Sequence, residues 1–587
     1  MKSNPRIKKN KQAINAKNAL ISQAVYLSKF NTLKKYVFEA ISQKPLNHKT
    51  DCIQDKSSFT VFISICDGSK RAKVYHASAN ILDDAWAKTQ SITISNIEKN
   101  KLKPIWYKVD IVDNIEKRPF SEMRSMFLSG FYQKFFRKGF SFDADMKMAF
   151  LEAEANAYKI YDYTVIPMKA SLPGFENVPC INLVQLKKYL EANEVNKDII
   201  EGISIPEDIY FFDCRSFFMD SEGKCYSLFD NSIHCGRRKM DELSKDFVED
   251  ILHSSSQYLV RQMKEDRSFI YGYFPSFNKT LTSYNILRHC GTIWSMMCAY
   301  DVTADDTLIE TINSGLYFML SQMVDYDGNT SFLVEEKASE IKLGGNGIAI
   351  ITLAKYIENF GEHNLVDPIY KLANGILHLQ NNETGKFTHV LEASDFSVKE
   401  EFRTVYYDGE SAYALIKAYE ITGAKVYLNA ARKAIDYFIE KNYIVYKDHW
   451  LAYAMNEFTK HVQEEKYFTF ALKNAWENRD KIRNQATTYH TYLELLLETY
   501  DVYKRMKNES ITNDYFNEID EDEFVEIIKY RALHMLDGYF FPEYAMYMSK
   551  PSVILGSFFV RHDEYRARID DNQHNIDAYA KFHKLIF

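Results

Sequence analysis

The feature that most constrains the fold is an alternation of two kinds of helix after about residue 240. One kind ends in a polar turn with an aromatic residue after it, as in ILHLQNNETGKFTHV (376–390). The other begins with a polar cluster and continues into small and apolar residues, as in DGESAYALIKAYE (408–420). Six helices of the second kind begin near residues 284, 346, 409, 448, 488 and 572. Six of the first kind precede them, near residues 246–264, 306–324, 366–380, 425–440, 465–478 and 522–537.

The spacing of these pairs indicates how they assemble. The steps between successive starts are irregular, from about 40 to about 84 residues, which argues against an open solenoid of equal repeats. Six inner and six outer helices instead predict a closed (α/α)6 toroid. The inner helices of such a toroid run parallel, so their N-termini meet at one mouth.

The first part of the chain has a different pattern of apolar residues, which predicts both strands and helices. The β-branched and aromatic runs at 58–66 and 105–112 predict strands, and residues 208–230 predict a hairpin that turns at Ser221-Glu222-Gly223. Apolar residues at helical spacing predict helices over 12–43, 81–97 and 145–158. The predicted domains are an N-terminal tail and helix (1–45), an α+β domain (46–240) and the (α/α)6 toroid (241–587).

Composition excludes several classes of protein. The formal net charge of −7 comes from interspersed charges of both signs, so the chain has no basic field for nucleic acid. The eight cysteines form no CxxC pair and no zinc spacing, and no run approaches eighteen apolar residues. We therefore expect a cytoplasmic protein without membrane span, metal or cofactor; the oligomeric state is open.

The GGNG cluster at 344–347, at the start of an inner helix, is a weak signal for nucleotide binding.

The alternating helices also resemble a known superfamily. Outer helices that end in Q-x-x-x-x-G-x-F/Y-like turns, and inner helices that open on G-x-A or D-G-E-S-A, resemble the six-hairpin glycosidases and the related sugar 2-epimerases and uronate-modifying enzymes. The resemblance covers roughly residues 245–587 and is architectural. It implies a carbohydrate-active enzyme whose substrate is a saccharide or polysaccharide bound at the mouth of the barrel.

Residues at the inner-helix starts carry the candidate chemistry. A helix N-terminus favours anions and lowers the pKa of a nearby histidine, which can then be a general base. Asp and Asn at such positions are also ordinary N-caps. The predicted catalytic residues are His289, Asp408, Glu410, Asp448, His449 and His574. The predicted substrate-binding residues are Tyr284, Arg288, Asn346, Tyr407, Trp450, Tyr489, His490, Arg566, Arg568, Asp570 and Gln573.

Several reactions fit this set of residues. In glycoside hydrolysis, Asp408 or Glu410 would work with Asp448 or Asp570 across the sugar. In epimerisation or β-elimination, a histidine would remove a carbon-bound proton while arginine or protonated histidine stabilises the anion, which suits an acidic or N-acyl sugar. Other hypotheses are a transferase that tailors a cell-surface, for example capsular, polysaccharide, and a non-catalytic saccharide-binding scaffold.

Overall fold

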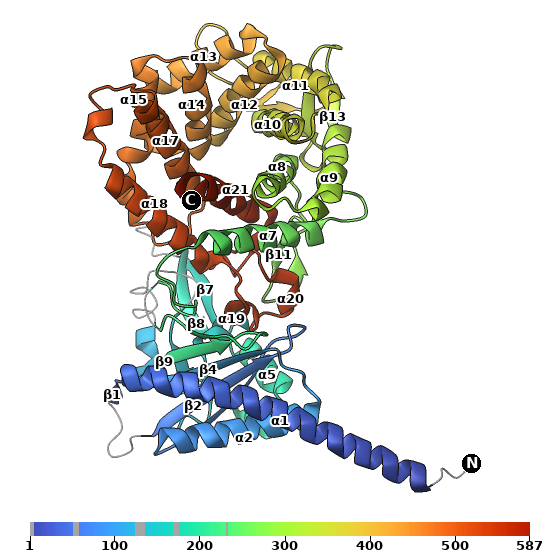
Figure 1. Ribbon diagram of the computed structural model, residues 1–587, viewed down its shortest axis with the longest axis vertical. Helices are drawn as coiled ribbons and strands as arrows, with labels where there is room; N and C mark the ends of the chain where they lie inside the picture. The colour runs from blue at the N-terminus through green and yellow to red at the C-terminus, as the bar shows by residue number, and fades with distance from the viewer. Residues whose placement is uncertain (1–4, 48, 51–57, 124–135, 168–174, 231–232) are drawn as a thin grey trace.

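The chain has a sheet-rich N-terminal region and a ring of helices after it, which lie at opposite ends of the molecule (Figure 1). The computed structural model describes residues 5–47, 49–50, 58–123, 136–167, 175–230 and 233–587. No helix in these ranges is both long and apolar enough to cross a membrane.

The N-terminal region is built on an antiparallel sheet. Its main strand order is β3-β2-β4-β9-β5-β6, with β1 beside β4 and β10 beside β9. The strands are β1 (Lys49–Thr50), β2 (Phe59–Cys66), β3 (Lys73–Ala79), β4 (Trp106–Pro119), β5 (Gly139–Ser141), β6 (Ala149–Phe150), β9 (Asp208–Met219) and β10 (Cys225–Ser227). The predicted strands at 58–66 and 105–112 and the hairpin at 208–230 are confirmed, since Met219 pairs with Cys225 across the turn.

Helices cover one face of this sheet. Phe30 and Leu33 of α1 (Pro5–Gln43) and Trp86 of α2 (Leu82–Asn100) pack on the buried strand β2. The predicted helix over 145–158 is wrong in its first part, because Ala149–Phe150 pair with β5 as strand β6, and only α4 (Glu152–Ala157) is helical. The remaining elements of the region are α5 (Leu183–Ala192), α6 (Lys197–Gly202) and the paired strands β7 (Tyr161–Pro167) and β8 (Phe175–Ile181).

A segment from the C-terminal part of the chain covers the other face. The short helices α19 (Pro542–Ala545) and α20 (Pro551–Ile554) leave the ring and pack among Trp106 and Phe218 of the sheet (Figure 1). Tyr547 donates a hydrogen bond to Ser64 at 2.9 Å, and the Ala72 amide donates to the Met546 carbonyl at 2.7 Å. Residues assigned from sequence to the toroid alone therefore also complete the core of the sheet.

Six inner helices form a closed ring. They are α8 (Ile286–Thr303), α10 (Leu343–Phe360), α12 (Tyr406–Thr422), α14 (His449–His461), α17 (Thr491–Asn508) and α21 (Ile569–Ile586). Each packs against the next in this order, and α21 packs against α8 to close the ring. Long runs of these helices are buried on all sides, as in Ile348–Ala354 of α10, which is why their sequences lack a polar face.

Six outer helices surround the ring. They are α7 (Lys245–Gln262), α9 (Ile309–Ser321), α11 (Val366–His378), α13 (Lys425–Glu440), α15 (Glu465–Trp476) and α18 (Glu521–Met535). Each precedes an inner helix in the chain, as the sequence predicts. Neighbouring inner and outer helices pack together around the whole circle (Figure 1).

Glycines allow the inner helices to approach closely. A Cβ on Gly347 of α10 would lie 3.1 Å from the backbone of Glu410 in α12, and one on Gly344 would lie 2.6 Å from Cδ1 of Tyr407. The GGNG cluster thus has a packing function in the ring, which accounts for it without a nucleotide.

Short strands also occur in the helical region, where the sequence pattern predicts almost none. One antiparallel sheet contains β13 (Met323–Asp325), β14 (Ser331–Glu335), β15 (Glu340–Lys342), β16 (Val390–Glu392) and β17 (Val398–Glu400). Another contains β11 (Gly272–Phe274), β12 (Lys279–Thr280) and β18 (Ala567–Arg568). Two of these strands, β15 and β18, lead directly into the inner helices α10 and α21 and so fix where those helices begin.

Candidate active site

Local capping determines where the inner helices begin. Asp448 is the N-cap of α14 and accepts hydrogen bonds from the amides of Trp450 at 3.0 Å and Leu451 at 3.3 Å. Asn285 caps α8 in the same way. The cap makes His449 the first residue of its helix and holds it at the mouth of the ring.

Three histidines from different inner-helix starts lie together at this mouth. The ring centroids of His449 and His574 are 5.0 Å apart with an interplanar angle of 79°. His490 stacks on His574 at 5.0 Å and 16°. The structure therefore brings together three of the four histidines that the sequence places at helix starts.

A buried glutamate joins this histidine cluster. Glu494 of α17 has no exposed surface, and its Oε2 lies 3.0 Å from Nδ1 of His574 and 4.0 Å from Nε2 of His449. Its Oε1 accepts a hydrogen bond from the Tyr453 hydroxyl at 3.2 Å. Neither ring nitrogen of His449 has a hydrogen-bond partner among the residues that the structure describes.

Burial controls the protonation of the cluster. It lowers the pKa of His574 to about 4 and of His490 to about 3, and it places the pKa of His449 well below the usual value. Burial also holds the pKa of Glu494 well above the ordinary range. The three imidazoles are therefore neutral at physiological pH, with lone pairs available to accept a proton.

Arginines and aspartates flank the histidines. Nε of Arg288 lies 3.2 Å from Oδ2 of Asp570, and Nε of Arg568 lies 3.2 Å from Oδ1 of the same carboxylate. Arg568 also donates to Asp571 at 2.8 Å. Glu410 is buried, its pKa is held well above normal by burial, and its Oε2 has no hydrogen-bond partner among the described residues.

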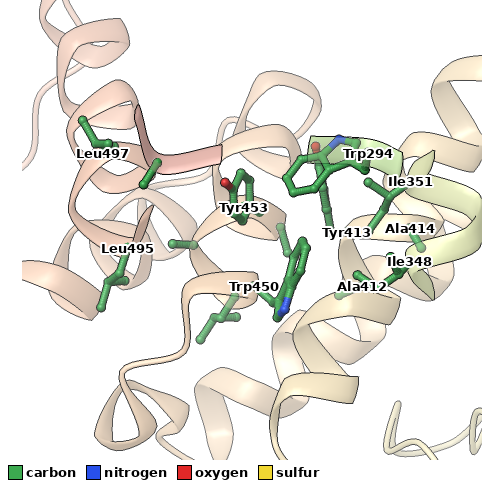
Figure 2. Close-up of a cluster of buried hydrophobic side chains, with 14 of the residues drawn as sticks. Trp294, Ile348, Ile351, Ala412, Tyr413, Ala414, Trp450, Tyr453, Leu495 and Leu497 are labelled. Carbon is green, nitrogen blue, oxygen red and sulfur yellow. The ribbon is translucent and has the colours of Figure 1, made fainter. Parts of the chain in front are cut away.

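Aromatic side chains line the rim and the base of the mouth. Tyr406 meets His449 edge-on at 5.6 Å, and its hydroxyl lies 3.2 Å from that of Tyr489, which is 41% exposed. Trp450, only 2% exposed, packs beneath His449 and against Trp294 in the cluster shown in Figure 2. Tyr489 is thus exposed at the rim, whereas Trp450 is buried at the base.

The structure places His289 away from this cluster. Its Nδ1 lies 2.6 Å from the Tyr284 hydroxyl, its Nε2 lies 2.9 Å from the Gly315 carbonyl of α9, and its ring packs between Phe269 and Phe318. Both nitrogens are satisfied and the residue has no exposed surface. His289 and Tyr284 therefore connect an inner to an outer helix, and we leave them out of the proposed site.

Other predicted residues also have structural partners. Asn346 bonds the backbones of Ser331, Leu333 and Leu372 with its amide group. Asp408 lies 3.2 Å from both Nε2 of His389 and the Tyr443 hydroxyl.

Three more predicted residues are held by neighbouring side chains. Gln573 packs against the bare Cα of Gly291, Tyr407 packs 5.6 Å from His389, and Arg566 pairs with Asp563. Together with Asn346 and Asp408, they support the mouth through packing and hydrogen bonds.

Sequence reasoning missed Glu494 and Tyr453. Glu494 follows His490 by four residues inside the leucine-rich run TYLELLLETY, a spacing that puts both on one helix face. An acid on the inward, apolar face of a helix was the available signal. Tyr453 follows His449 by the same interval.

Two groups of side chains could hold a metal ion. One consists of His449, Glu494 and His574, and the other of His234, His534 and Asp537; in each, the ligand atoms lie within 4.8 Å of one another. Asp537 of the second group already pairs with Arg237 at 2.8 Å.

Comparisons with known proteins give likenesses of fold only. The sequence matches no family model and no curated protein. Among solved structures, cellobiose 2-epimerase from Bacillus thermoamylovorans B4167 aligns with 58% of this chain and 100% of its own, at 12% identity and a TM-score of 0.45. D-mannose isomerase aligns with 58% of this chain and 98% of its own, at 10% identity and a TM-score of 0.45. An unsaturated glucuronyl hydrolase specific for heparin aligns with 58% and 98%, at 12% identity and a TM-score of 0.39.

These identities and scores are too low to assign a family. The architecture rests on the helix contacts of this chain, in which each inner helix packs on the next and the last packs on the first. By those contacts, the inner and outer helices between Lys245 and Ile586 form an (α/α)6 toroid, a fold similar to that of the six-hairpin glycosidase-like enzymes.

Proposed function

We propose that the mouth of the toroid is the active site of a carbohydrate-active enzyme of the epimerase or isomerase type. The observation that carries this proposal is the pair His449 and His574, two neutral imidazoles 5.0 Å apart on different inner helices. A base and an acid on separate elements can remove a proton from a sugar carbon beside a carbonyl and return one to the other face.

The surroundings of the two histidines favour different roles. His449 has no hydrogen-bond partner at either ring nitrogen among the described residues, so a lone pair is available to take the carbon-bound proton. His574 has Glu494 behind its Nδ1 at 3.0 Å, so its Nε2 can donate a proton while Glu494 supplies another. We therefore propose His449 as the base and His574 as the acid.

The carboxylates favour this reaction over glycoside hydrolysis. Hydrolysis requires two carboxyl groups, one on each side of the scissile bond. Asp448 is engaged as a helix cap and Asp408 in hydrogen bonds with His389 and Tyr443. Buried Glu410 and Asp570 each have an oxygen without a hydrogen-bond partner among the described residues, but Asp570 is ion-paired with Arg288 and Arg568. Glu410 therefore supports a hydrolase as the second candidate, with Glu410 as the acid.

Arg288 supports a substrate with an acidic or N-acyl group. Its side chain is 31% exposed; Nε is ion-paired with Asp570, and Nη1 donates a hydrogen bond to the Tyr271 hydroxyl. Among the described residues no partner is present for its remaining nitrogen, which can reach a carboxylate or an acyl oxygen. The open-chain form of a reducing sugar would place its carbonyl beside the two histidines.

The proposal is tested by proton exchange at carbon. The protein is incubated in D2O with hexoses, N-acylhexosamines and uronic acids, and proton NMR follows loss of the signal from the carbon next to the carbonyl. We expect exchange with one class, and its loss in His449→Gln and His574→Gln but not in His461→Gln, at the far end of α14. If no sugar in the panel exchanges, or if the first two variants exchange normally, the proposal fails.

A further inference from the structure

The toroid has a second opening on the side opposite the histidine cluster. A cavity of about 230 Å³ lies among the middle and C-terminal parts of the inner helices, and all six contribute to its lining. The cavity is lined by the aromatic residues Trp294, Tyr413 and Tyr453. Trp294 and Tyr453 pack against Trp450 (Figure 2), whose ring in turn contacts His449. The cavity thus comes within one layer of side chains of the candidate active site.

Ion pairs surround the opening of this cavity. Lys355 and Lys584 both pair with Asp301, at 2.6 and 2.9 Å, and Lys581 pairs with Asp501 at 2.6 Å. The Lys584 side chain is 49% exposed, so the rim is in contact with solvent. Charged groups of both signs at such a rim retain water, and water brings exchangeable protons.

Tyr453 connects the cavity to the histidine cluster. Tyr453 lines the cavity, and its ring stacks on that of Tyr413 with the centroids 5.6 Å apart. Its hydroxyl donates to Oε1 of Glu494 at 3.2 Å, and Oε2 of the same carboxyl lies 3.0 Å from Nδ1 of His574. Tyr453, Glu494 and His574 therefore form a continuous chain of hydrogen-bonding groups from the cavity wall to the imidazole.

We propose that Tyr453 and Glu494 form a proton relay from this cavity to His574. The inference rests on the proposed function, in which His574 gives a proton to a sugar carbon. When Nε2 of His574 gives its proton to the carbanion, Nδ1 receives the proton of Glu494 Oε2. Oε1 then receives the Tyr453 hydroxyl proton, and cavity water reprotonates the tyrosine. One proton leaves water and one carbon–hydrogen bond forms.

Carboxyl groups in the cavity wall fit this direction of transfer. Asp577 and Glu498 line the cavity, and burial raises the pKa of each above its ordinary value. Glu494 itself has no exposed surface and contacts Tyr453 through one carboxyl oxygen and His574 through the other, so it lies at the centre of the relay. A relay of this kind would let the substrate close the front mouth while protons still arrive from behind.

The first test needs no substrate. In protein labelled with ¹⁵N-histidine, the Glu494 proton is assigned by its coupling across the hydrogen bond to Nδ1 of His574 and by its loss in His574→Gln. Its exchange with water is then measured by saturation transfer. Tyr453→Phe removes only the hydroxyl, and we expect it to slow exchange about tenfold. Tyr413→Phe, which removes a hydroxyl from the same cavity wall, is the matched control and should leave exchange unchanged. Equal rates in Tyr453→Phe and wild type, or equal slowing in both variants, would overturn the relay.

The second test uses the sugar found in the D2O panel. Tyr453→Phe and Glu494→Gln should lower kcat by about tenfold or more at unchanged KM and raise the solvent isotope effect. Tyr413→Phe should match wild type in both. If wild type turns over a sugar and Tyr453→Phe behaves identically, the relay is refuted and the function stands. If no sugar is turned over, the function fails, and the exchange measurement alone decides whether the relay exists.

Discussion

The adjacent glycines at the start of α10 give a sharp test of how the ring is packed. A Cβ on Gly344 would lie 2.6 Å from Tyr407 Cδ1, 2.9 Å from Leu287 Cδ1 and closer still to Glu410 Oε2. A Cβ on Gly345 would meet nothing nearer than 3.9 Å, where Leu333 lies. The same substitution at neighbouring positions of one helix should therefore have opposite effects.

The expected magnitudes follow from two opposing contributions. Alanine in place of glycine stabilises a helix interior by about 1 kcal/mol. Forcing a methyl group into a packed core costs about 1–3 kcal/mol, and all three neighbours of Gly344 would have to move. We expect Gly344→Ala to lower the free energy of unfolding by about 1–2 kcal/mol, and Gly345→Ala to raise it by up to ~1 kcal/mol.

Thermal unfolding followed by circular dichroism measures both variants. For a helical region of this size, these changes correspond to a fall in Tm of about 2–3 °C for Gly344→Ala and a rise of about 1 °C for Gly345→Ala. A shift of the same sign in both variants would refute the packing explanation. Restored stability in a Gly344→Ala, Glu410→Ala double variant would identify the glutamate as the group displaced.

Three further predictions concern other contacts. The His574 imidazole has a pKa of about 4 in the folded protein and about 6.5 in the unfolded chain. Its contribution to the stability of the folded protein is therefore present above pH 6.5 and is lost as the pH falls toward 4. Over this pH range, Tm should fall less steeply in His574→Gln than in wild type. Asp448→Ala should lower the free energy of unfolding by about 1 kcal/mol, while Asp448→Asn keeps the cap and should match wild type in urea titrations. Arg71 donates hydrogen bonds to the carbonyls of Ala157, Ser276 and Tyr547. Arg71→Met should leave these acceptors unpaired and lower the free energy of unfolding by about 2–4 kcal/mol. Lys70→Met, at the exposed neighbouring position, should leave it unchanged.

The toroid could be predicted from sequence because the features that specify each of its helices lie within that helix or beside it in the chain. Apolar periodicity and N-cap residues fix each helix independently, and the partner helix expected over 425–440 coincides with α13. The docking of α19 and α20 on the sheet could not be predicted in this way. It depends on contacts between residues such as Ser64 and Tyr547, far apart in the chain, which leave no periodic signal.

The candidate site was predictable only in part, because position at a helix start does not determine direction. Successive residues of an α-helix turn by about 100°, so the exact residue decides which way a side chain points. His449 is the first residue of α14 and joins the cluster, whereas His289 is the fourth of α8 and points to α9. Glu494 was not predicted because it lies among leucines, and only the fold shows that it faces the histidines.

The excursion of α19 and α20 to the sheet has a consequence for the order in which the protein can fold. After α18 the chain runs to the N-terminal region, where α19 and α20 pack, and then runs back to the ring as α21. Helix α21 closes the ring and carries His574. All the strands of this sheet precede α18 in the chain, so they are synthesised before the segment that completes their core and before α21. The proposed acid His574 therefore lies on a helix that is synthesised after the sheet and after the other five inner helices. Catalytic competence would then report on the integrity of the whole molecule.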